Sequence, residues 1–214
     1  MTHPDRLVVK VGGSLYDHPR LKVGLKAWLA ARPEAHILIV PGGGDFAEAV
    51  RRLDTMHGLG EGFAHLLALQ SLETAALFVQ DIVGVFEKYG DYELWNLEPL
   101  CVMPHPRQFL RRYQNQDCVQ LPQTWEFTTD SLAACSAHDA GCELVLLKSV
   151  DIPPSMAWED AAARGYVDAY FPTLVARHNL RVTAVNFRAV LDGSAAGAAS
   201  GGRQSAVPPR PGED

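Results

Sequence analysis

The sequence lacks the metal-binding and nucleotide-binding motifs of several common enzyme classes. Its four cysteines form no C-x-x-C pair, and its eight histidines form no H-x-x-x-H or H-E-x-x-H pair, so we predict no protein-ligated metal ion. The Walker motif G-x-x-x-x-G-K-[ST] is absent, and no G-x-G-x-x-G follows the first predicted strand. These absences exclude a P-loop NTPase and argue against a dinucleotide-binding Rossmann domain.

Positive charge and long apolar runs are also scarce. The formal net charge of −6 argues against a basic groove for nucleic acid or a polybasic membrane surface. No uninterrupted apolar run approaches the ~18 residues that cross a bilayer, and a strand pattern stands where a signal peptide would have its apolar core. We therefore expect a cytoplasmic protein with reduced thiols that binds neither nucleic acid nor membrane.

The length and composition predict one folded domain followed by a tail. With 214 residues, of which 47% are hydrophobic, the chain can bury a core without disulfides or metals. From about Asp192 onward Gly, Ala, Ser and Pro dominate, which is typical of disordered chain. We predict a single domain over residues 1–192 and a disordered tail over residues 193–214.

Short apolar runs alternate with helical patterns along the chain. Residues 7–11 read as a β-branched strand and residues 37–40 as a strand buried on both faces, and each leads through a glycine turn into a helix. Further strands are predicted at 100–103, 144–147 and 180–185, and further helices at 62–88, 107–113, 129–140, 157–163 and 171–178. Residues 114–127 are predicted to be irregular. This alternation predicts an α/β fold whose mostly parallel sheet is covered by helices on both faces.

The segment 62–88 is apolar nearly all round its predicted helix. Such a helix is buried in a core or in a contact between subunits. We therefore expect the protein to form a homo-oligomer.

Two glycine turns end two neighbouring predicted strands. Lys10-x-Gly12-Gly13-Ser14 follows the first strand, and residues 42–44 are all glycine and follow the second. Consecutive glycines let backbone N–H groups turn toward an anion, and a helix that begins just after them adds the positive end of its dipole. Either turn alone would commonly be only a tight connection. Both at one edge of a parallel sheet predict a phosphate site.

Two lysines, Lys10 and Lys148, lie in otherwise apolar strands. An ammonium group there is costly unless it meets a counter-charge or extends to solvent. Thr129 or Asp130 can cap the helix that follows, as Asp45 can cap the helix after the second turn. Asp130 can also hold the two lysines, and cations around a migrating group are what phosphoryl transfer needs.

Side chains near the turns have more than one interpretation. Arg51 and His65 follow the second glycine turn, and each either belongs to a solvated face or faces an anionic acceptor. The core is the predicted place of Trp125 and Phe127, and also of Cys135 and Cys142.

Four segments, in this order, resemble the amino acid kinase superfamily, the fold of aspartate, glutamate and uridylate kinases. They are VKVGGS at 9–14, PGGG at 41–44, TTDSLAA at 128–134 and LKSVD at 147–151. The resemblance runs over residues 6–192. It implies a three-layer α/β/α sandwich that binds ATP with Mg²⁺ and a small-molecule phosphoryl acceptor over the carboxyl edge of its sheet.

The resemblance also implies roles for individual residues. By position, Lys10 and Lys148 would stabilise the transferring phosphoryl group, and Asp130 would organise both lysines. The implied nucleotide-binding residues are Gly12, Gly13, Ser14, Ser149 and Asp151. The implied acceptor-binding residues are Gly42, Gly43, Gly44, Arg51 and His65.

Within the superfamily, the short chain and the stretch from Gly58 to His65 look most like the small kinases of methanofuran-type cofactor biosynthesis, in one-carbon metabolism. Those enzymes phosphorylate aminomethyl-furanmethyl phosphate. Two alternatives remain: a kinase whose acceptor is a carboxylate or a nucleoside monophosphate, and a non-catalytic member that binds a nucleotide or another anion.

Overall fold

A computed structural model describes residues 6–84, 100–103, 105–117, 121–122 and 124–194. Most of the predicted tail, residues 195–214, lies outside the described residues. The elements in chain order are β1 (Arg6–Val11), the short 3-10 helix η1 (Gly13–Leu15), α1 (Leu21–Ala30), β2 (His36–Pro41), α2 (Gly44–His57), α3 (Glu61–Val83), β3 (Leu100–Val102), α4 (Pro106–Asp117), α5 (Thr129–Ala140), β4 (Glu143–Lys148), α6 (Trp158–Ala163), α7 (Phe171–His178), β5 (Val182–Asn186) and α8 (Phe187–Asp192).

The five described strands form one parallel sheet in the order β3-β2-β1-β4-β5. From β1 the chain moves outward to β2 and β3 on one side, then returns to place β4 on the other side of β1. Lys10 pairs with Val40 on β2 and with Leu146 on β4. The direction of winding therefore reverses between β1 and β4, and ligands of open parallel sheets bind beyond the carboxyl ends of the strands at such a point.

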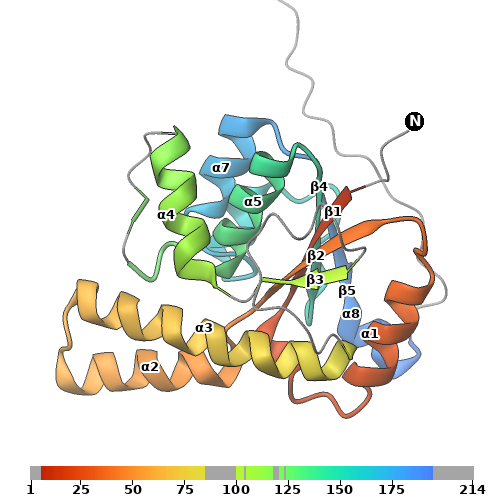
Figure 1. Cartoon of the computed structure of the whole chain (residues 1–214), viewed down its shortest axis with the longest axis horizontal. Coiled ribbons are helices and arrows are strands. Elements are labelled where there is room, and N and C mark those ends of the chain that lie inside the picture. The colour runs from red at the N-terminus through yellow and green to blue at the C-terminus, as the bar shows by residue number, and fades with distance from the viewer. Residues whose placement is uncertain (1–5, 85–99, 104, 118–120, 123, 195–214) are drawn as a thin grey trace, which may run out of the picture.

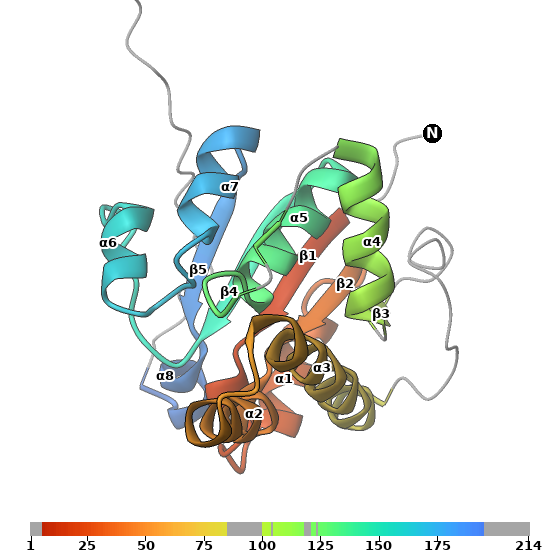
Figure 2. The same cartoon turned by 90° about the vertical axis from the view of Figure 1, so that its left-hand side faces the viewer.

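Helices cover both faces of the sheet (Figures 1 and 2). Because side chains alternate along a strand, Val8, Leu144 and Leu146 pack with α4, α5, α6 and α7 on one face. Val9 and Leu147 pack with α1, α8 and the second half of α3 on the other face. The three-layer α/β/α sandwich and the parallel sheet are confirmed.

Helix α3 spans both helical layers. Leu69 and Leu72 join the core on the α5 face, whereas Ala76 and Val79 join the core on the α1 face. By length and a mean hydropathy of 1.4, α3 is the single helix within the described ranges that could cross a membrane. Its contacts with both cores are those of a core helix in a globular protein.

Helices α2 and α3 form an antiparallel hairpin that extends beyond the sheet (Figure 1). Apolar side chains that are more than a third exposed lie along it: Phe46, Leu53, Met56, Phe63 and Leu77. These side chains suit a contact between subunits, and the homo-oligomer stays a prediction.

Several predicted boundaries were wrong. Helix α3 ends at Val83, five residues early, because Gly84 takes a left-handed conformation with φ of 80°. Helix α4 continues to Asp117, into the stretch that was predicted to be irregular. Strand β5 continues to Asn186, where the side-chain oxygen accepts a hydrogen bond from the Ala189 N–H and caps α8.

The predicted helix caps were also wrong. Neither Thr129 nor Asp130 caps α5; its N-cap is Thr128, whose side chain makes no capping bond. Asp45 lies in the first turn of α2, behind the N-cap Gly43. The core placement of Cys135, which is buried, and of Cys142, which packs against the same core, is confirmed.

Candidate active site

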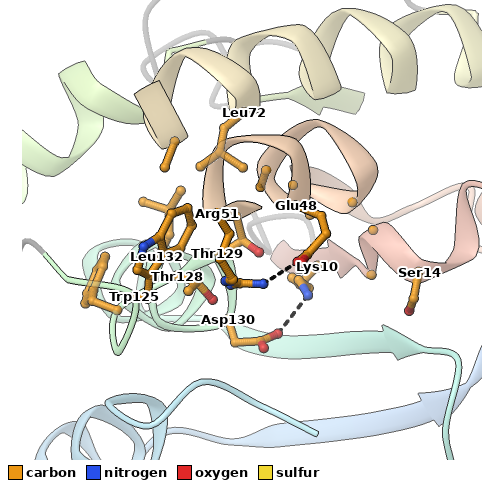
Figure 3. Close-up of a pocket in the computed structure, with 18 of the residues that line it drawn as sticks. Lys10, Ser14, Glu48, Arg51, Leu72, Trp125, Thr128, Thr129, Asp130 and Leu132 are labelled. Carbon is orange, nitrogen blue, oxygen red and sulfur yellow. Dashed lines mark hydrogen bonds and ion pairs between the residues drawn. The ribbon is translucent and has the colours of Figure 1, made fainter. Parts of the chain in front are cut away.

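A carboxylate bridges two ammonium groups at the reversal point of the sheet. Asp130 Oδ1 lies 2.9 Å from Lys10 Nζ and 2.7 Å from Lys148 Nζ, and Asp130 Oδ2 accepts a second hydrogen bond from Lys148 at 2.9 Å. All three side chains are buried, with 7–8% of their surface exposed. Figure 3 shows Lys10 and Asp130 facing each other at the base of a pocket.

The fold explains why these three side chains meet. Lys10 lies one residue before the end of β1, and Lys148 is the last residue of the adjacent strand β4. Both side chains point to the α5 face, since Lys148 follows Leu146 by two positions and Leu146 pairs with Lys10. Asp130, in the first turn of α5, lies directly over that face.

Burial and mutual charge together set the pKa values of the bridge. Burial alone would raise the pKa of Asp130, but the ammonium groups of Lys10 and Lys148 outweigh it and lower the pKa to about 2. Burial lowers the pKa of Lys148 to about 8; Asp130 opposes this shift, and Lys10 adds to it. At neutral pH the trio therefore carries a net positive charge in a desolvated site, which favours an anionic ligand.

The two glycine turns touch through their backbones. A Cβ atom on Gly13 would lie 2.1 Å from the backbone nitrogen of Gly44, and one on Gly42 would lie 2.4 Å from the backbone nitrogen of Gly13. The hydroxyl of Tyr16 donates a hydrogen bond of 2.6 Å to the Gly42 carbonyl, and burial raises the pKa of that hydroxyl. Both turns line the pocket beside the lysines, and α2 begins there, so the N–H groups that a helix start leaves unsatisfied lie at the pocket.

The predicted nucleotide residues divide into two groups. Gly12, Gly13, Ser14 and Ser149 line the pocket, and the hydroxyls of Ser14 and Ser149 are 2.7 Å apart, which joins the end of β4 to the first glycine turn. Asp151 is exposed and lies outside the pocket lining.

The pocket has a volume of about 650 Å³ and a second wall made by α2, α3 and the segment before α5. Arg51 pairs with Glu48 at 2.6 Å, and its guanidinium lies 4.6 Å from the ring centre of Trp125. The indole N–H of Trp125 donates to Asp54 at 3.1 Å. Trp125 is thus a half-buried part of the wall, in contrast to its predicted core position, because polar groups of α2 hold both its ring and its N–H.

His65 also lines the pocket, and its contact with an acceptor stays a prediction. It is half-buried, and burial together with the charge of Arg107 lowers its pKa. Phe127 is buried in the core, as predicted.

Three solved structures that share this fold are kinases. Uridylate kinase from Archaeoglobus fulgidus matches with a TM-score of 0.57 and 15% identity, over 89% of this chain and 97% of that one. UMP kinase from Bacillus anthracis matches with a TM-score of 0.53 and 15% identity, over 90% and 93%. This chain has the amino acid kinase fold. Aspartate kinase from Synechocystis matches with a TM-score of 0.55 and 11% identity, over 83% of this chain and 37% of that one.

A curated relative adds a sequence match. The chain is 39% identical over 67 residues to a [5-(aminomethyl)furan-3-yl]methyl phosphate kinase from Methanocaldococcus jannaschii. The matched stretch spans 31% of this chain and 31% of that relative. No protein-family model matches the chain.

In this amino acid kinase fold, a residue that the sequence analysis missed also supports the site. The carboxylate of Asp168 accepts hydrogen bonds from Thr128 and Ser131, which flank Asp130. The sequence shows only that Asp168 lies three residues before the start of the helical pattern of α7. That position predicts the local hydrogen bond from the Phe171 N–H, which is 3.0 Å long, but not the bonds to α5.

The residues of the pocket fit phosphate groups better than a protein-bound metal. Lys10, Lys148, the glycine turns and the hydroxyls of Ser14 and Ser149 offer hydrogen-bond donors to a phosphate chain. Within the part of the chain that the structure describes, no group of three His, Cys, Asp or Glu side chains could hold a metal ion. A magnesium ion would accordingly be held mainly by the oxygen atoms of the nucleotide phosphates and by water.

Proposed function

We propose that this protein is an ATP-dependent kinase that transfers the γ-phosphoryl group to a small phosphate monoester. The observation that carries the proposal is the buried bridge of Lys10, Asp130 and Lys148 beneath the two glycine turns. The amino acid kinase fold and the short match to a named kinase support it.

The geometry suits phosphoryl transfer. Charge develops on the oxygens of the migrating group, and preorganised cations in a desolvated site stabilise that charge. Lys10 and Lys148 supply the cations, while Asp130 fixes both ammonium groups on one side of the pocket. The nucleotide phosphates would lie against Gly12, Gly13 and the two serines, with magnesium neutralising part of their charge. A phosphate monoester is already an anionic nucleophile, so the transfer needs no general base.

The pocket wall made by α2, α3 and the segment before α5, here called the acceptor wall, limits the range of acceptors that suit the site. It carries the carboxylates of Glu48, Asp54 and Glu61 beside Arg51, which Glu48 already neutralises. Such a wall suits an acceptor that combines a phosphate with an ammonium group better than a purely anionic one. We take [5-(aminomethyl)furan-3-yl]methyl phosphate as the specific candidate, and with it a place in methanofuran-type cofactor biosynthesis, because the relative that matches residues of this chain acts on that compound.

The test is ADP release from the purified protein with ATP and Mg²⁺ and four acceptors. These are the aminomethyl furan phosphate, the same compound with methyl in place of aminomethyl, UMP and aspartate. We expect turnover with the first compound, and a weaker reaction with the second because it lacks the ammonium group. The product should resist hydroxylamine, which traps an acyl phosphate but not a phosphoanhydride.

Each remaining outcome corrects the proposal in a defined way. A hydroxamate formed from aspartate would indicate a carboxylate kinase, and turnover with UMP alone would indicate a nucleotide kinase. Thermal stabilisation by ATP without ADP release from any acceptor would contradict catalysis and indicate a nucleotide-binding protein.

A further inference from the structure

Asp168 makes five hydrogen bonds from the loop between α6 and α7. Its Oδ2 atom accepts from the backbone N–H of Thr128 at 3.0 Å, from the Thr128 hydroxyl at 2.9 Å and from the backbone N–H of Ser131 at 2.9 Å. Its Oδ1 atom accepts from the Ser131 hydroxyl and from the backbone N–H of Phe171. The side chain thus connects the start of α5 to the start of α7.

These bonds replace a local cap on α5. Helix starts leave N–H groups unsatisfied, and the side chain of the N-cap residue usually accepts one from the third helical residue. Here the N-cap Thr128 makes no such bond, and Asp168 accepts the N–H of Ser131, the third helical residue, in its place. The position of the first turn of α5 is therefore set by a residue 37 positions further along the chain.

Asp130 lies between the two residues that Asp168 holds. Its own carboxylate contacts Lys10 and Lys148. With Thr128 and Ser131 fixed, the backbone of Asp130 cannot shift, and a misplacement of about 1 Å at a reacting centre can cost 10²-fold in rate.

We propose that Asp168 is a positioning residue for phosphoryl transfer: it fixes the first turn of α5 so that Asp130 bridges Lys10 and Lys148. The catalytic consequence rests on the proposed function, whereas the effect on the bridge does not.

The first test is the variant Asp168→Asn. Asparagine keeps one acceptor oxygen and replaces the other with an NH2 group that faces N–H and O–H donors, so the cap is weakened while the size of the side chain is kept. We expect kcat to fall roughly 10- to 100-fold, with the KM for ATP and for the acceptor changed by less than about twofold. The matched control is Thr183→Val, which removes the 2.8 Å bond to Glu143 near the opposite edge of the sheet. The control should lose stability and keep kcat.

The second test measures the pKa of Lys148 in the bridge and needs no enzyme activity. Lysines labelled with ¹³C at Cε are titrated by NMR, and Lys148 is assigned by the loss of its signal in Lys148→Met. The charged groups that face Lys148 are Asp130 on α5 and Lys10 on β1. In Asp168→Asn the carboxylate of Asp130 is displaced and stabilises the Lys148 ammonium less. The pKa of Lys148 should therefore be at least about 0.5 pH units lower than in wild type. Thr183→Val should leave this titration unchanged.

The outcomes separate the two proposals. Absence of kinase activity in the wild-type protein would contradict the proposed function. The NMR titration would still test whether Asp168 positions Asp130. An Asp168→Asn protein with lower stability but with an unchanged Lys148 titration overturns the positioning role. Where that variant fails to fold, Ser131→Ala removes a single hydroxyl bond, and a smaller shift in the same direction is expected.

Discussion

At the inner end of the pocket the side chains of Lys10, Asp130 and Lys148 are 7–8% exposed, whereas at the rim those of Arg51 and Glu48 are 45% and 61% exposed. Buried charges act in a low dielectric and are held by strands and a helix start, while an exposed ion pair is screened by water and contributes little stability. The inner end is therefore suited to chemistry that is common to many acceptors. The rim is suited to choosing among acceptors.

The strongest way to break this comparison is Lys148→Met, which keeps an apolar stem and removes the ammonium group. We expect kcat to fall roughly 10³-fold or more, because a cation on the migrating phosphoryl group is lost. The matched control is Lys22→Met, since Lys22 is 56% exposed and pairs weakly with Asp81 at 3.6 Å. Steady-state kinetics and circular dichroism check both variants. If the kcat of Lys148→Met stayed within tenfold of the wild-type kcat, the assignment of the chemistry to the inner end of the pocket would be wrong.

A side chain between the glycine turns tests the backbone part of the inner end. In Gly13→Ala the new Cβ would lie 2.1 Å from backbone of the second turn, so the two turns must separate. We expect the affinity for ATP to fall by roughly tenfold or more because the turns that are proposed to bind the phosphates move. Isothermal titration measures it. Gly62→Ala is the control, because a Cβ there meets open space, and it should bind ATP as wild type does.

The pH dependence sharpens the contrast between activity and stability. Lys148, whose pKa is about 8, loses its proton above that pH, so kcat/KM should fall about tenfold per pH unit on the alkaline side. Between about 8 and the ordinary value of 10.5 the unfolded chain binds more protons at this lysine than the folded chain does. The contribution of Lys148 to stability therefore rises over the window in which activity is lost. Urea unfolding of wild type and Lys148→Met from pH 7.5 to 10 checks the sign.

The smallest expected effect is at the rim. Arg51→Ala removes the guanidinium from Glu48 and from the ring of Trp125. We expect the KM for the acceptor to rise by about tenfold or less, with kcat and the KM for ATP nearly unchanged. Arg52→Ala, at an exposed neighbour outside the pocket lining, is the control. A larger loss in kcat than in acceptor affinity would place Arg51 with the inner end.

The inner end could be predicted from the sequence because its parts are local. Lys10 and Lys148 each interrupt an apolar strand, and the glycine turns follow strands directly. The role of Asp130 was more ambiguous, since an Asp near a helix start satisfies the rule for a cap equally well. Its use by the lysines depends on the pairing of β1 with β4, which no local pattern contains.

The rest could not be predicted, because it depends on packing between distant segments. Trp125 is a large apolar residue of a type that is commonly buried. Its indole N–H has an acceptor only because the fold places Asp54 of α2 beside it. Asp168 bonds to residues 37 and 40 positions away, so a single sequence offers nothing to connect them. Helix ends were mislocated for a related reason, since Gly84 ends α3 within an apolar pattern that continues past it.

The order of the strands has a consequence for synthesis on the ribosome. Lys10 belongs to the first strand, its partner strand β4 ends at Lys148, and Asp168 comes later still. The nascent chain must therefore include Lys148, far from Lys10 in the sequence, before the lysine bridge can form. A product of premature termination before residue 143 lacks β4 and with it Lys148, so an incomplete copy would not contain the assembled bridge.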